Sequence, residues 1–189
     1  MLQDFKVLYA VFRIVTMQLF ILVRSINMTV RVNFKGVMTI SALLAMALAA
    51  SAVEPAPRFH AKSMDGENFS NESVKGKVVL VQFWATWCKY CRGEQSVVDE
   101  LTREFADRGL VVLAVDFMEP KKTVKKYLEG MPRACKVVLT EDTNLAAMYP
   151  TRSFPLYVAI DREGNVAGTQ RGAGGAGALR RLLSKAGIE

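Results

Sequence analysis

The chain has 189 residues, enough for one ordinary domain and an extension. Its formal net charge is +7, but the part from Val53 onward carries 20 Lys and Arg against 17 Asp and Glu, a net charge of about +3. The basic excess therefore lies in the first 52 residues. The charge of the remainder argues against nucleic-acid binding.

Residues 28–52 have the layout of a secretory signal peptide or a membrane anchor. Arg31 and Lys35 form a basic region, residues 37–50 an apolar core, and Ala50-Ser51-Ala52 a cleavage site of the A-x-A type. No cysteine lies near that site, which argues against a lipid-anchored cysteine. We therefore expect the chain after residue 52 to be exported, either into the periplasm or anchored to the membrane and facing it.

Residues 1–27 contain a second apolar stretch, residues 7–23, with Arg13 at its centre. A charge at the middle of a membrane span is costly. Because Met28 would start a normal signal peptide, we interpret residues 1–27 as an upstream extension of the reading frame. The alternative is an additional hydrophobic segment, and the positive-inside rule then still places the later domain outside the cytoplasm.

The remaining chain alternates between patterns typical of strands and of helices. Residues 53–58 are predicted to be an extended linker because of their prolines, and residues 59–189 to form the folded domain. Apolar runs predict buried strands, and 3.6-residue periodicity predicts helices. The predicted elements are a hairpin within 58–73, strands at 77–83, 110–116, 136–139, 156–160 and 165–171, and helices at 92–107, 120–129, 142–149 and 178–186.

Three local features refine these elements. Gly109 is predicted to end the first helix, Asp142 to cap the third, and residues 172–177 to form a flexible glycine-rich break. The four lysines of the second helix are interpreted as a solvated face, with a docking surface for an acidic partner as the alternative. Alternating strands and helices predict an α/β fold whose mixed central sheet carries helices on both faces.

Three cysteines and one histidine limit the kinds of site that the chain can build. A structural zinc site needs four ligands, usually as two pairs, and only Cys88 and Cys91 form a pair. Covalent haem attachment needs histidine directly after the second cysteine, where this chain has Arg92. A hydrolase built on a cysteine and a histidine would have to use His60, which no motif supports. We expect no metal site, and redox chemistry remains.

Cys88 and Cys91 follow a buried strand and stand at the start of a helix. Two cysteines three residues apart there lie on one face, close enough to form a small disulfide ring. Unpaired N–H groups and the positive end of the helix dipole favour a thiolate at this position. The pattern is that of a dithiol switching between reduced and oxidised forms.

The residues around this pair resemble the TlpA/ResA-like branch of the thioredoxin superfamily, which comprises extracytoplasmic thiol–disulfide oxidoreductases of bacteria. The likeness includes Trp84-Ala85-Thr86-Trp87-Cys88-x-x-Cys91-Arg92-x-Glu94 and extends from about Phe59 to the C-terminus. It implies a thioredoxin-like fold with an N-terminal hairpin and an inserted strand and helix around residues 136–149. The WxxWCxxC core is much more specific than an isolated CxxC.

The resemblance implies roles for individual residues. Cys88 would be the exposed nucleophile, Cys91 the buried resolving thiol, and Pro155 the cis-proline that faces them. Glu94 would share a face with Cys91 and exchange protons or tune the thiols. The alternative for Glu94 is a surface glutamate favoured near the helix N-terminus by the dipole.

Four further residues are predicted to contact substrate: Trp87, at the rim where a partner docks, Lys89 and Tyr90 between the cysteines, and Phe154 before the proline. Lys89 should favour the Cys88 thiolate, although solvent screens an exposed cation. Phe154 departs from the smaller or β-branched residue usual in the branch, which predicts a more apolar substrate groove.

Two further residues are interpreted individually. Gln82 replaces the buried acid of cytoplasmic thioredoxin. Cys135 is interpreted as a buried apolar residue, with an intermolecular disulfide as the alternative.

We therefore expect an exported thiol–disulfide oxidoreductase whose cofactor is its own Cys88–Cys91 disulfide. Its partners would be protein thiols and disulfides and a membrane or periplasmic electron donor, and we expect a monomeric domain. The branch commonly acts as a reductase in cytochrome c maturation, which makes that role the first hypothesis. Two alternatives are a thiol peroxidase, whose usual proline before the cysteine is missing here, and a non-enzymatic binding or chaperone module, against which the intact CxxC argues.

Overall fold

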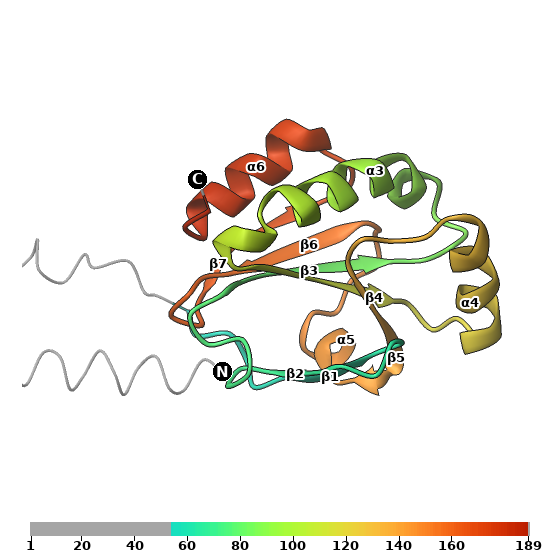
Figure 1. The fold of residues 1–189 in the computed structure, drawn as a ribbon, viewed down its shortest axis with the longest axis horizontal. Helices are drawn as coiled ribbons and strands as arrows, with labels where there is room; N and C mark the ends of the chain where they lie inside the picture. Colours follow the sequence, from blue (N-terminus) through green and yellow to red (C-terminus); the bar gives the residue numbers. More distant parts are fainter. Residues whose placement is uncertain (1–53, 189) are drawn as a thin grey trace, which may run out of the picture. The chain divides into compact units, whose positions relative to one another are not determined.

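Seven strands pair into one mixed sheet in residues 54–188, the part of the chain that the structure, a computed structural model, describes (Figure 1). Their bounds are β1 His60–Ser63, β2 Asn68–Ser70, β3 Val78–Trp84, β4 Leu110–Asp116, β5 Lys136–Thr143, β6 Leu156–Ile160 and β7 Val166–Arg171. The order across the sheet is β2-β1-β5-β4-β3-β6-β7. β3, β4 and β5 are parallel, while the remaining neighbours pair antiparallel. The predicted hairpin and antiparallel edge are confirmed.

β3 is central because its side chains are apolar on both faces of the sheet. All seven of its residues are buried. Val78, Leu80 and Trp84 belong to one apolar core, whereas Val79 and Phe83 belong to the other. Because neighbouring strand residues point to opposite faces, this strand contributes to both cores. Its C-terminal end leads directly into the CxxC segment.

Helices cover both faces of the sheet, as predicted. They are α3 Lys89–Glu104, α4 Lys121–Gly130, α5 Leu145–Met148 and α6 Gly175–Lys185, with a short 3-10 turn η1 at Ala106–Arg108. α3 and α6 pack side by side on one face, and α5 lies on the other (Figure 1). The lysines of α4 are exposed and its Val124 is buried, in agreement with the solvated-face interpretation.

Two helices begin three residues before their predicted starts. α3 begins at Lys89 because the Cys88 side chain caps it, accepting a hydrogen bond from the Cys91 N–H. α6 begins at Gly175, inside the segment predicted to be a flexible break. There the Gly175 N–H donates to the Glu94 carboxylate of α3, a tertiary contact that local periodicity does not report. Gly109 ends the α3–η1 segment in the left-handed conformation, as expected.

The cap assigned to Asp142 is wrong. β5 extends through Asp142 to Thr143 because β1 pairs with it, placing Ala61 opposite Thr143. The Thr143 hydroxyl accepts the N–H of Leu145, the first residue of α5, and donates to the His60 carbonyl. α5 is consequently only four residues long.

The first described residues, ahead of Phe59, pair with the domain. Residues 54–56, part of the expected linker, hydrogen-bond to the segment that joins β6 and β7: Ala56 N–H donates to the Gly164 carbonyl, and Val166 N–H to that of Glu54. The predicted signal or anchor segment and the upstream extension lie outside the described residues. Within residues 54–188, none of the helices has the length and apolar character needed to cross a bilayer.

Candidate active site

The CxxC pair forms a disulfide at the N-terminus of α3. The two sulfurs of Cys88 and Cys91 are bonded, and their Cα atoms lie 5.3 Å apart. Cys88 Sγ also accepts the Cys91 N–H at 3.1 Å. Helix N–H groups and the helix dipole are therefore directed at the Cys88 sulfur, an arrangement that stabilises a thiolate once the disulfide is reduced.

The expected difference in exposure between the two cysteines is small in this disulfide form. Cys88 is 5% exposed and Cys91 2%, so the prediction of an exposed Cys88 is wrong for this state. The disulfide ring turns the Cys88 sulfur back onto the first turn of α3, where the residue joins the apolar core. Cys91 is buried, as expected.

Exposed aromatic side chains lie in and beside the CxxC segment. Trp87 is 62% exposed and Tyr90 68%, and the ring of Trp87 meets that of Phe154 edge-on at 6.0 Å. Phe154 in turn packs against Phe117 at 4.8 Å. The Phe154–Pro155 peptide bond is cis, as the resemblance implied. The structure thus brings the Phe154 ring, far away in the sequence, next to the Trp that precedes Cys88.

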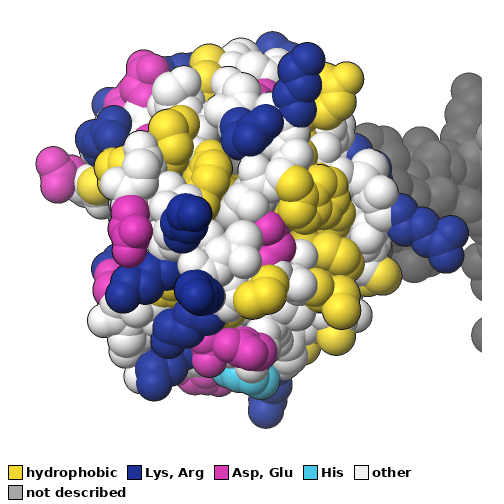
Figure 2. All heavy atoms as spheres, turned by 90° about the vertical axis from the view of Figure 1, so that its right-hand side faces the viewer, with side chains coloured by type: hydrophobic (Ala, Val, Ile, Leu, Met, Phe, Trp, Pro, Cys, Tyr) yellow, Lys and Arg dark blue, Asp and Glu magenta, His cyan; other side chains and the backbone are white. Residues whose placement is uncertain are grey.

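This end of the sheet presents an apolar surface with cations beside it. Met118 is 74% and Met131 46% exposed, and Lys89 and Arg92 are exposed at the start of α3. Figure 2, which views this end, shows hydrophobic side chains gathered beside groups of Lys and Arg. Exposed apolar patches of this kind mark sites of interaction with other molecules.

Glu94 is buried one turn after Cys91, which excludes the alternative of a surface glutamate. It is 5% exposed, and both of its carboxylate oxygens accept hydrogen bonds. The Tyr157 hydroxyl of β6 donates to Oε2 at 2.7 Å, and the Gly175 N–H donates to Oε1. Burial and the neighbouring Glu94 raise the pKa of Tyr157 far above its usual range, so this hydroxyl stays protonated.

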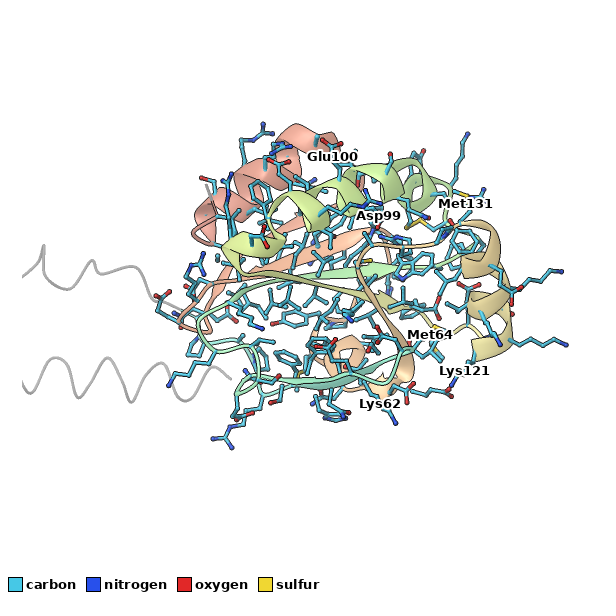
Figure 3. The ribbon with its side chains drawn as sticks, viewed as in Figure 1. Lys62, Met64, Asp99, Glu100, Lys121 and Met131 are labelled. Atoms are coloured by element: carbon cyan, nitrogen blue, oxygen red, sulfur yellow. A yellow bond between two sulfur atoms is a disulfide. The ribbon has the colours of Figure 1, made fainter. Side chains whose placement is uncertain are left out.

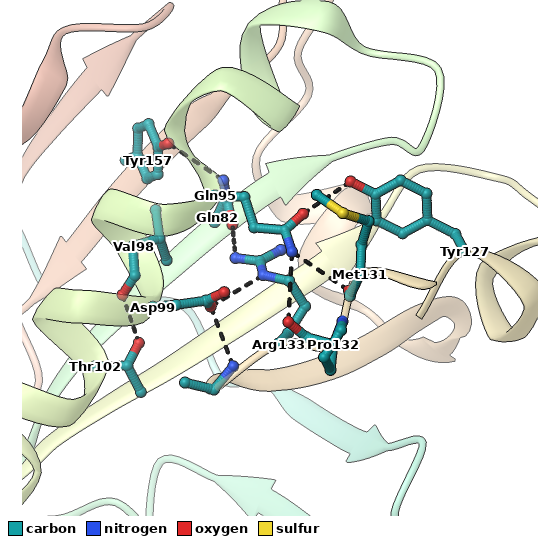
Figure 4. Close-up of polar contacts among 11 residues, drawn as sticks. Gln82, Gln95, Val98, Asp99, Thr102, Tyr127, Met131, Pro132, Arg133 and Tyr157 are labelled. Carbon is teal, nitrogen blue, oxygen red and sulfur yellow. Dashed lines mark hydrogen bonds and ion pairs between the residues drawn. The ribbon is translucent and has the colours of Figure 1, made fainter. Parts of the chain in front are cut away.

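The structure adds a buried polar cluster that sequence reasoning missed (Figure 4). Arg133 Nε bonds Asp99 Oδ1 at 3.0 Å, and Arg133 Nη2 donates to Gln82 Oε1 at 3.1 Å. Gln82 Nε2 then donates to the Tyr157 hydroxyl at 3.2 Å. Asp99 turns beneath α3, whereas its neighbour Glu100 points outward (Figure 3). The sequence did carry one signal of this cluster: Asp99 stands on the apolar side of α3, and a buried charge requires a partner.

A second group of carboxylates lies behind the active-site loop. Glu119 accepts both the Thr86 N–H and the Thr86 hydroxyl at 2.6 Å, and its own N–H donates to Asp116 Oδ2 at 3.0 Å. Asp116 is fully buried, and its Oδ1 has no hydrogen-bond partner among the described residues. Burial and the adjacent Glu119 raise the pKa of Asp116 to about 7.

Cys135 is buried at 7% exposure, in agreement with its interpretation as an apolar residue. Burial raises the pKa of its thiol to about 11, which keeps it protonated and unreactive near neutral pH. His60 is exposed on β1. Among residues 54–188, no three His, Cys, Asp or Glu side chains gather in a way that could hold a metal ion.

The fold and the site define a thioredoxin-like protein: a CxxC disulfide at a helix N-terminus and a cis-proline directly before the neighbouring antiparallel strand β6. Comparison with known proteins agrees. Residues 53–169 match the model of the AhpC/TSA family, and the chain belongs to that family. Thiol:disulfide interchange protein of the thioredoxin family from Chlorobium tepidum TLS has a solved structure similar to this one, with a TM-score of 0.65 and 29% identity over 73% of this chain and 99% of that chain.

Two curated relatives support the resemblance to the TlpA/ResA-like branch. Thioredoxin-like protein YneN of Bacillus subtilis (strain 168) is 36% identical over 118 residues, which cover 59% of this chain and 66% of the relative. Thiol-disulfide oxidoreductase ResA of Bacillus cereus is 29% identical over 111 residues, covering 59% and 64%. The chain thus spans slightly less than two thirds of the length of these relatives.

Proposed function

We propose that this protein is a thiol–disulfide oxidoreductase that exchanges its Cys88–Cys91 dithiol with disulfides of other proteins. The observation that carries this proposal is the pair itself: two cysteines at disulfide distance, with Cys88 capping α3. The name of the ResA relative and the similarity to a thiol:disulfide interchange protein support it.

The reaction begins with the reduced protein. The Cys88 thiolate, stabilised at the helix N-terminus, attacks a partner disulfide, forms a mixed disulfide with one partner sulfur and expels the other as a thiolate. Cys91 then loses its proton and attacks Cys88 Sγ, which restores the Cys88–Cys91 disulfide and releases the second partner thiolate. The protein dithiol is oxidised by two electrons and the partner disulfide is reduced by two.

Glu94 fits the role of the base in the second step. It lies one helical turn from Cys91 on the buried side of α3, and both of its oxygens accept hydrogen bonds as a carboxylate does. In our proposal Glu94 takes the Cys91 proton as the Cys91 sulfur attacks Cys88 Sγ, and the proton then passes to the departing partner thiolate.

The aromatic rim fits the docking of an extended partner segment. Trp87, Tyr90 and Phe154 supply apolar contact area, and the backbone beside Pro155 supplies hydrogen-bonding groups. Lys89 adds a positive charge next to Cys88. These residues are proposed to select the partner rather than to carry out the exchange.

Replacement of each cysteine tests the mechanism. We expect Cys88→Ala to abolish reduction of insulin disulfides, because the attacking sulfur is lost. Cys91→Ala should instead accumulate mixed disulfides, which non-reducing electrophoresis detects, because the resolving sulfur is lost. Cys135→Ala serves as the control, since its buried thiol takes no part. Wild-type rates in both Cys88→Ala and Cys91→Ala would refute the proposal.

Peroxide turnover separates this function from that of a thiol peroxidase, which the family name AhpC/TSA makes worth testing. Consumption of hydrogen peroxide by the reduced protein should be negligible compared with its reduction of insulin. A binding or chaperone module would retain its partner affinity in Cys88→Ala/Cys91→Ala, and a pull-down with that variant measures this.

We further propose that the domain works outside the cytoplasm as a reductase, for example of apocytochrome c cysteines before haem attachment. The apolar core and A-x-A site in residues 28–52 support export. N-terminal sequencing of the exported protein should find Val53 first if the signal is cleaved. An equilibrium with glutathione that leaves the pair reduced only under strongly reducing conditions supports the reductase direction, whereas a readily reduced pair indicates an oxidant.

A further inference from the structure

The hydrogen bonds of the buried polar cluster beneath α3 all run in one direction from donor to acceptor. Arg133 is a donor only, because a guanidinium has five N–H groups and no acceptor. Its Nη2 lies 3.1 Å from Gln82, which forces the oxygen of the Gln82 amide to face Arg133. The NH₂ group of Gln82 must then face the Tyr157 hydroxyl, at 3.2 Å. The hydroxyl oxygen accepts there, so its own proton is free for Glu94.

The last hydrogen bond of this series reaches Glu94. The Tyr157 hydroxyl is 2.7 Å from Glu94 Oε2, and both side chains are buried. Arg133, Gln82 and Tyr157 therefore form a hydrogen-bond chain in which each group donates to the next. This hydrogen-bond chain ends on the Glu94 carboxylate, which only accepts. Asp99 holds the start of the chain by pairing with Arg133 Nε, and the Arg133 side chain is only 2% exposed.

We propose that Tyr157 is a positioning residue of the dithiol site, and that Arg133, acting through Gln82, makes the Tyr157 hydroxyl the donor that holds the Glu94 carboxylate in place for Cys91. Four elements supply these groups: α3, β3, β6 and the segment between α4 and β5. The role of Tyr157 in thiol exchange rests on the function proposed above, whereas the direction of the hydrogen bonds from Arg133 to Glu94 does not.

An aromatic disulfide, 5,5′-dithiobis(2-nitrobenzoate), separates the two steps of the reaction. Attack by the Cys88 thiolate expels the first coloured thiolate and leaves an aryl mixed disulfide on Cys88. Cys91 then passes its proton to Glu94, attacks Cys88 Sγ and expels the second. Each phase is followed by absorbance in a stopped-flow instrument, and Cys91→Ser, which can release only the first, assigns them.

Tyr157→Phe should slow the second phase by about tenfold and leave the first within about twofold, since one hydrogen bond to a charged group is lost. Tyr127→Phe is the matched control. It also removes a tyrosine hydroxyl that bonds an α3 side chain, Gln95 at 2.8 Å, but it leaves the chain to Glu94 intact. Neither phase should change in this control.

Two substitutions of Gln82 test the direction of the hydrogen-bond chain while Tyr157 is still present. Gln82→Glu places a carboxylate, which can only accept, opposite the Tyr157 hydroxyl and draws its proton away from Glu94. We expect it to slow the second phase as much as Tyr157→Phe does. Gln82→Met removes the amide that donates to Tyr157 but adds no new acceptor. The Tyr157 hydroxyl can then still donate to Glu94, so the effect of this variant should be smaller.

A double-mutant cycle decides whether Tyr157 acts through Glu94. In a Glu94→Gln background, Tyr157→Phe should slow the second phase no further. Three results would overturn the inference. The effects of Tyr157→Phe and Glu94→Gln could multiply in the double variant, Tyr157→Phe could slow both phases equally, or the control Tyr127→Phe could slow the second phase to the same extent. Melting temperatures identify loss of the fold. If the reduced wild-type protein never releases the second thiolate, the proposed function itself fails; if it does and Tyr157→Phe matches it, only this inference fails.

Discussion

Two carboxyl side chains lie behind the CxxC loop, and one of them, Asp116, is fully buried. Asp116 ends β4 fully buried, opposite Trp84 of β3, and the adjacent Glu119 holds the Thr86 backbone of the active-site loop. Burial disfavours the charged form of a carboxyl group, and a second carboxyl close by disfavours it further. The pKa of Asp116 is consequently raised to about 7.

This raised pKa predicts a pH-dependent stability. Between the ordinary value of 3.8 and about 7 the folded chain keeps a proton on Asp116 that the unfolded chain releases. Stability should therefore fall as pH rises through this window. Asp116→Asn stays neutral, so we expect it to exceed the wild type by about 1–3 kcal/mol at pH 8 and to match it near pH 4. Urea unfolding at both pH values measures this, and parallel pH profiles would contradict it.

At the scale of elements, the CxxC helix is defined by its two ends. Cys88 caps its start, and Gly109, with φ of 80°, ends the segment that follows it. The left-handed conformation of Gly109 favours glycine, and the start of the helix uses the Cys88 sulfur as its hydrogen-bond acceptor. The second turn of α3 is more permissive, because Gly93 is exposed and a Cβ there would meet nothing within 4 Å.

These two glycines give a matched pair of substitutions. Gly93→Ala should raise the free energy of unfolding by about 0.5–1 kcal/mol, because glycine is a poor residue in a helix interior. Gly109→Ala should lower it by about 1–2 kcal/mol, because a Cβ strains the left-handed conformation and would meet Arg162 Nη1 at 3.3 Å. Thermal unfolding of the two variants should give shifts of opposite sign. Shifts of the same sign would refute the account of the helix ends.

At the scale of the whole described domain, the dithiol and a set of stabilising loop contacts lie at opposite ends of β3. The dithiol follows the C-terminal end of β3, whereas Arg162 joins segments at the opposite end of that strand. Its Nη1 donates to the Gly76 carbonyl at 3.0 Å and its Nη2 to the Arg108 carbonyl at 2.8 Å. A strand of seven residues spans roughly 20 Å, so the two ends are far apart.

Arg162→Met should therefore change stability without changing exchange. We expect it to lower the free energy of unfolding by about 1–2 kcal/mol, because two bonds from a charged group to backbone carbonyls are lost. The rate of insulin-disulfide reduction should stay at the wild-type value. Arg103→Met, at an exposed position on α3, is the control and should leave both quantities unchanged. A slower exchange rate in Arg162→Met would show that the two ends are coupled.

The sequence by itself determined the fold class, the position of the CxxC pair and most of the elements. Continuous apolar runs such as residues 156–160 identify buried strands because both faces of the sheet need apolar side chains. Two cysteines three residues apart before a helix specify the dithiol through local geometry alone. The cis bond before Pro155 followed only from the resemblance, because local sequence does not determine it.

Tertiary structure decided what depends on partners distant in the sequence. α6 starts at Gly175 because its N–H finds Glu94, and β5 reaches Thr143 because β1 lies beside it. The chain from Arg133 through Gln82 to Tyr157 joins residues 51 and 75 positions apart, which no periodicity records. Buried polar groups must be paired, but a one-dimensional pattern does not state with which group, so the surroundings of Glu94 emerged only when the chain was folded.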